Sequence, residues 1–157
     1  MTPRGSEITQ VHVVTWLCVV LTLTACQMGA GEEITARTPY ADLIGAKYSV
    51  VADNLVAYGV YSSLDSQTIG YVMLKPGGAS GPEIAFRRNV PKGQVIRILS
   101  AWRRFIPFES GVYYVVAIEN SDLPQGIPIR LEIYKGANGG VGADLNPAVY
   151  KKLPKAN

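Results

Sequence analysis

The chain has 157 residues with 15 basic and 12 acidic side chains, which gives a formal net charge of +3. This length suits one domain, and the 16 glycines and 10 prolines are typical of a loop-rich β domain, below the level of a disordered chain. So weak a positive charge does not predict binding to nucleic acid, and we expect no such partner.

The residues from Val13 to Ala25 form an uncharged run rich in Val and Leu. Its length fits the apolar region of a signal peptide, since a membrane-spanning helix needs about 20 apolar residues. The run ends in Leu23-Thr24-Ala25-Cys26, which resembles the lipobox of bacterial lipoproteins. An uncleaved anchor with a buried Cys26 is the alternative.

The lipobox resemblance implies a signal peptide over residues 1–25 and a lipid-modified Cys26, with palmitate among its acyl chains. It also implies a cell-envelope protein anchored in the outer membrane, with its domain on the periplasmic face, because Gln27 rather than Asp follows the cysteine. Cleavage would leave 14 basic and 11 acidic residues, again +3.

Cleavage would also remove Cys18 and His12, the only histidine. Triads that need a histidine, and metal sites built on His or Cys, would then lack a required member. We therefore predict no catalytic residue, no metal site and no cofactor, and expect that the protein is not an enzyme. An enzyme that works with carboxylates or tyrosines alone remains the alternative.

Residues 26–39 offer no periodic apolar face, so we predict a flexible tether there and a single β domain over residues 40–157. Seven runs in that domain have strand-like composition. They are Lys47 to Ala52, Leu55 to Ser62, Gln67 to Lys75, Glu83 to Arg88, Gln94 to Arg104, Val112 to Glu119 and Ile129 to Tyr134. Asn146-Pro147 predicts a short helix that ends near Leu153.

The spacing of these runs leaves no room for βαβ crossovers and predicts a mainly β fold, either a small antiparallel barrel or a sandwich, with the short C-terminal helix. The longest run places Ile96, Ile98 and Trp102 on one face if it alternates regularly, and with apolar residues on both faces it should bend. The stretch from Pro91 to Trp102 resembles a strand of bacterial SH3-like barrels, which implies a small barrel of that type.

The densest aromatic and basic cluster predicts a partner-binding site. It consists of Trp102, Arg103, Arg104 and Phe105, with Arg87 and Arg88 beside it if the strands on either side of residues 90–93 pair. Residues 112–116 could add tyrosines to the same face. Interfaces favour Trp, Tyr and Arg. The alternative is an ordinary solvated strand end with Trp102 in the core.

Two functions follow as expectations. The first is a lipid-anchored envelope protein that binds another envelope protein, as a secretion or assembly accessory or as an immunity or inhibitor protein. The second is a module that binds peptidoglycan through an SH3-like groove.

Overall fold

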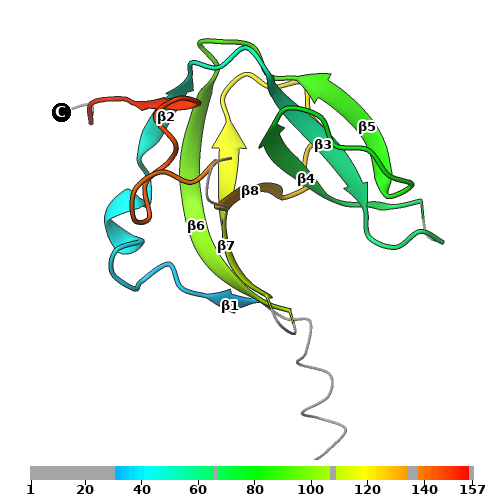
Figure 1. Ribbon diagram of the computed structural model, residues 1–157, viewed down its shortest axis with the longest axis horizontal. Helices are drawn as coiled ribbons and strands as arrows, with labels where there is room; N and C mark the ends of the chain where they lie inside the picture. Colours follow the sequence, from blue (N-terminus) through cyan, green and yellow to red (C-terminus); the bar gives the residue numbers. More distant parts are fainter. Residues whose placement is uncertain (1–30, 66, 107–108, 134–137, 156–157) are drawn as a thin grey trace, which may run out of the picture.

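A computed structural model describes residues 31–65, 67–106, 109–133 and 138–155. These residues form one curved sheet of nine strands, with a single 3-10 turn, η1 (Ala41–Leu43), beside it (Figure 1). The strands are β1 (Glu32–Glu33), β2 (Lys47–Val50), β3 (Leu55–Tyr61), β4 (Ile69–Pro76), β5 (Ile84–Asn89), β6 (Val95–Ile106), β7 (Glu109–Ile118), β8 (Ile129–Ile133) and β9 (Tyr150–Lys152).

The mainly β class is confirmed, and each of the seven predicted runs contains a strand. The strand order is β5-β3-β4-β8-β7-β6-β2-β9, with β1 beside β6. The sheet is not closed, and β4 and β8 run parallel, with Val72 opposite Ile129. A closed, all-antiparallel barrel is therefore a wrong expectation, because β5 pairs with β3 and leaves a free edge, and the sheet is not clearly an SH3-like barrel.

A β-bulge at Leu99 interrupts the regular in–out alternation of side chains along β6, the longest strand. Ile98 lies opposite Val116, but the next paired residue, Ser100, lies opposite Val115, so Leu99 is an extra residue in β6. The extra residue puts Ala101 on the buried face, where it is completely inaccessible. The prediction that Trp102 shares a face with Ile96 and Ile98 is therefore wrong, whereas the predicted bend is visible in Figure 1.

The chain before residue 40 belongs to the domain. β1 pairs with β6, and Ile34 is completely buried. The N–H of Ile34 donates to the carbonyl of Ala101, and the N–H of Ala101 donates to Thr35 Oγ1. The predicted tether is wrong for residues 31–39, because the hydrogen bonds described above join this segment to the edge of β6. Cys26 and the predicted signal peptide lie outside the described residues.

The predicted C-terminal helix is wrong. Asn146 starts a single turn, in which its Oδ1 accepts from the N–H of Ala148 and its carbonyl accepts from Val149 and Tyr150. The chain then continues as β9 along the free edge of β2, with Tyr150 opposite Val50. An eight-residue helix is only marginally stable alone, whereas this pairing satisfies a strand edge and buries Tyr150.

The C-terminal segment closes the core over the inner face of the sheet (orange to red in Figure 1). Asn138 is buried and donates from Nδ2 to the carbonyls of Leu74 and Glu132. Its Oδ1 accepts from the Tyr150 hydroxyl at 2.8 Å. One side chain thus joins β4, β8 and β9.

Three core tyrosines have pKa values well above the ordinary value of 10, chiefly because burial penalises the charged phenolate. They are Tyr48, Tyr114 and Tyr150. The Tyr48 hydroxyl also donates to Asp144 Oδ1 at 2.7 Å, and this carboxylate raises its pKa further. All three therefore remain neutral hydrogen-bond donors, and Tyr114 donates to the carbonyl of Ala143.

Candidate binding surface

Aromatic and arginine side chains gather on the outer face of four adjacent strands. Trp102 on β6 lies opposite Tyr113 on β7, and Tyr113 lies opposite Glu132 on β8. Directly opposed residues point to the same face of a sheet. We call this group the arginine–aromatic stripe, and its members are Trp102, Arg104, Tyr113, Arg130, Glu132 and Tyr71.

The centre of the stripe is an arginine between two aromatic rings. The guanidinium carbon of Arg130 lies 4.2 Å from the ring centroid of Tyr71 and 5.0 Å from that of Tyr113. Its Nε is buried and has no hydrogen-bond partner. The guanidinium thus lies close to both rings, and cation–π attraction to them holds the three side chains in one arrangement.

An ion pair and a hydrogen bond order the rest of the stripe. Arg104 Nη2 lies 3.0 Å from Glu132 Oε1, and the Glu132 residue is only 9% exposed. The indole N–H of Trp102 donates to Ser100 Oγ at 2.9 Å. The chain at Gly31 passes close to this face, since a Cβ there would lie 3.1 Å from the Arg103 carbonyl oxygen and 3.4 Å from the Tyr113 hydroxyl.

The predicted cluster of six residues is only partly formed. Trp102 and Arg104 share the outer face, but Arg103 lies beside Glu32, at 3.8 Å between Nη1 and Oε2. The side chain of Phe105 lies outside the described side chains. The expectation that Arg87 and Arg88 lie next to this strand is wrong, because four strands separate β5 from β6.

The two β5 arginines have partners of their own. Arg88 Nη1 donates to Asp122 Oδ2 and to the Asp122 carbonyl, both at 2.8 Å. The guanidinium of Arg87 lies 6.0 Å from the ring centroid of Tyr58. Because β5 pairs with β3, Arg87 and Arg88 make these contacts at the β5 end of the sheet, away from β6.

Four members of the stripe, Tyr71, Tyr113, Arg130 and Glu132, were not among the six predicted site residues. The alternation over residues 129–133 already places Arg130 and Glu132 outside the core, so that signal was present. Tyr71 could not be found in this way, because its place beside Arg130 depends on the parallel pairing of β4 with β8. Of the two tyrosines in residues 112–116, Tyr113 lies on the face of Trp102 and is 9% exposed, whereas Tyr114 is buried in the core.

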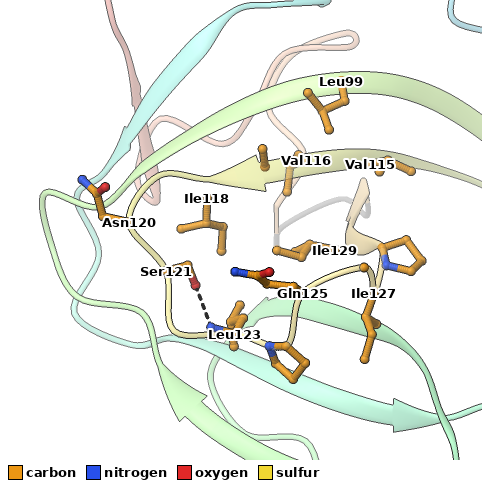
Figure 2. A pocket seen from close by; sticks show the side chains of 14 residues that line it. Leu99, Val115, Val116, Ile118, Asn120, Ser121, Leu123, Gln125, Ile127 and Ile129 are labelled. Atoms are coloured by element: carbon orange, nitrogen blue, oxygen red, sulfur yellow. Dashed lines mark hydrogen bonds between the residues drawn. The ribbon is translucent and has the colours of Figure 1, made fainter.

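A second concave region lies between β7 and the chain that connects it to β8 (Figure 2). This groove has a volume of about 590 Å³, within the range of ligand pockets. Leu99, the bulge residue, is 43% exposed and lies at its rim. The hydrogen bond from the Leu123 N–H to Ser121 Oγ shapes the connecting chain. No residue that lines the groove is ionisable, and Asn120, Ser121 and Gln125 line it together with apolar residues.

Among the residues that the structure describes, no three His, Cys, Asp or Glu side chains are grouped so that they could hold a metal ion. Within the same ranges, no helix has the length and hydropathy needed to span a bilayer. No protein-family model, no curated protein and no solved structure matches this chain.

Proposed function

We propose that the protein is an envelope lipoprotein, anchored through Cys26, whose β domain binds another envelope protein through the arginine–aromatic stripe. The observation that carries the proposal is that five of its six side chains are Trp, Tyr or Arg and share one sheet face. These are the residue types that supply most of the binding energy in protein interfaces.

The order already present in the stripe supports this role. Binding usually costs about 0.5–1.5 kcal/mol for each long side chain that must be immobilised. Arg130 is held between two rings and Arg104 is held by Glu132, so much of that cost is already met by the fold. Such a surface presents the partly exposed rings of Trp102 and Tyr71 to a partner as rigid anchors.

A protein partner is favoured over a catalytic role by the same contacts. The one carboxylate of the stripe, Glu132, is paired with Arg104 and has no second carboxylate among the stripe residues for acid–base chemistry. The stripe therefore acts by contact. A protein that inhibits another protein, or assembles with it, by covering part of its surface needs only such a contact surface.

A photo-crosslinking amino acid at Met73 tests the proposal, because Met73 lies directly opposite Arg130 on the same face. The matched control carries it at Val141, which is 94% exposed and away from these strands. In intact cells we expect one defined protein adduct from position 73, none from position 141, and loss of the adduct when Tyr71→Ala is added.

Equal adducts from both positions, or no adduct from position 73, would contradict the stripe as the contact surface. Sedimentation of the purified domain with peptidoglycan is the companion measurement. Co-sedimentation without a protein adduct would favour the cell-wall alternative.

A further inference from the structure

We infer that the domain stands on the bilayer with the β1 end of β6 nearest the lipid and the β2–β9 end directed away. This inference rests on the proposed lipid anchor at Cys26. It adds a second interaction surface, since the end of the sheet formed by β1 and the last residues of β6 would lie against the lipid headgroups.

The register of β1 sets the direction from which the anchor arrives. Glu32 lies opposite Arg103 and Glu33 opposite Trp102, in antiparallel pairing. β1 therefore begins on the side of Arg104 and of the end of β6 at Ile106. The anchored end of the domain is the end at which β6 and β7 are joined, at the bottom of Figure 1.

The chain between Cys26 and Gly31 is too short to let the β1 end of the domain move far from the membrane. Gly31 is held against the sheet, since a Cβ there would lie 3.1 Å from the Arg103 carbonyl oxygen. Five residue steps separate it from Cys26, and at full extension they span at most about 17 Å. A tether that continued to residue 39 would allow more than twice that distance, so the docking of residues 31–39 is what fixes the orientation.

The charges at the two ends of the sheet differ. Near the anchor, Glu32 lies beside both Arg37 and Arg103, so acidic and basic groups offset each other. At the opposite end Lys47 pairs with Glu119 at 2.7 Å, whereas Arg97 and Lys151 are exposed basic side chains opposite Lys47 and Ser49. These two side chains place basic charge on the end that points away from the lipid, where it is open to an acidic partner.

Two single-cysteine labels measure the orientation, because the mature chain has no other cysteine than Cys26. Glu33→Cys places a dye on β1 and Lys151→Cys places the same dye on β9; both native side chains are exposed. Along β6 the two positions are separated by roughly 20 Å. The acylated protein, purified from membranes, is placed in phosphatidylcholine vesicles that contain a headgroup nitroxide lipid.

We expect the dye at position 33 to lose most of its emission and the dye at position 151 to keep most of it. Trp102, the only tryptophan after cleavage, gives a label-free check and should also be quenched. With about twelve Gly and Ser residues inserted after Gly29, the difference between the two dyes should disappear.

Equal loss at the two positions, greater loss at position 151, or a difference that survives the insertion would overturn the orientation. Flotation with the vesicles distinguishes a wrong orientation from failure of the lipid anchor. A protein that floats with the vesicles but shows equal losses contradicts the orientation alone, whereas one that does not float contradicts both the anchor and the orientation.

Discussion

Trp102 and Tyr113 lie directly opposite each other on the outer face of β6 and β7. Strict alternation from Ile96 and Ile98 would instead have placed Trp102 in the core. The bulge at Leu99 makes the difference, since it shifts every later residue of β6 by one position. The outer position of Trp102 thus depends on Leu99 being accommodated as a bulge.

Deletion of Leu99 should leave the facing of β6 unchanged. Ile98 and Ser100 already lie opposite the neighbours Val116 and Val115, so the shortened strand alternates regularly and keeps Ala101 in the core. We expect the deletion to cost less than about 2 kcal/mol in the free energy of unfolding, and Leu99→Ser, which keeps the bulge at a half-exposed site, less than about 1 kcal/mol. Urea unfolding measures both variants, and a loss of more than about 3 kcal/mol on deletion would show that the shortened strand does not keep this facing.

Arg130→Lys should lower stability although the charge is kept. A lysine cannot stack its head group flat on both Tyr71 and Tyr113, so we expect a loss of about 1–2 kcal/mol in the free energy of unfolding. Arg97→Lys, at an exposed position, is the matched control and should stay within about 0.5 kcal/mol. If the two variants unfold at the same urea concentration, the stacking contributes nothing to stability.

The sequence predicts the strands well and their partners poorly. Alternation locates all seven longer strands, because each is half buried. β1 and β9 have two and three residues and are too short for any period to be detected. The Asn146-Pro147 pair fits a helix start and a single turn equally well. The parallel pairing that brings Tyr71 to Arg130 is a contact between distant parts of the chain, so no local pattern could predict it.

Gly59→Ala should destabilise the sheet because Phe86 lies across the glycine. A Cβ at position 59 would be 2.3 Å from the Phe86 ring, so the ring must move. We expect a loss of about 1–3 kcal/mol in the free energy of unfolding. Gly78→Ala is the control, since a Cβ there meets nothing within 4 Å. Thermal melting compares the two, and an unchanged Gly59→Ala melting temperature would refute the close approach.

Stability should fall at alkaline pH because of the core tyrosines. In the unfolded chain each phenol ionises near pH 10, but burial keeps the pKa of Tyr48, Tyr114 and Tyr150 higher in the folded chain. Above pH 10 the unfolded state therefore binds fewer protons than the folded state, so the stabilisation present below pH 10 is lost as the pH rises.

Tyr150→Phe removes one of these groups and should make the decline above pH 10 shallower. It also removes the hydrogen bond to Asn138, which should cost about 1–2 kcal/mol at neutral pH. Urea unfolding between pH 7 and 11 measures both effects. A decline as steep as that of the unchanged protein would argue against a raised pKa at this residue.

The most direct test of the central claim, that Cys26 holds this domain at the membrane, is fractionation of cells that express Cys26→Ser. We predict that the variant leaves the membrane fraction, whereas Cys18→Ser, the matched change at the other cysteine, stays with the membranes and still carries acyl chains by mass spectrometry. A Cys26→Ser protein that remains with the membranes in the same amount as the unchanged protein would contradict the lipid anchor.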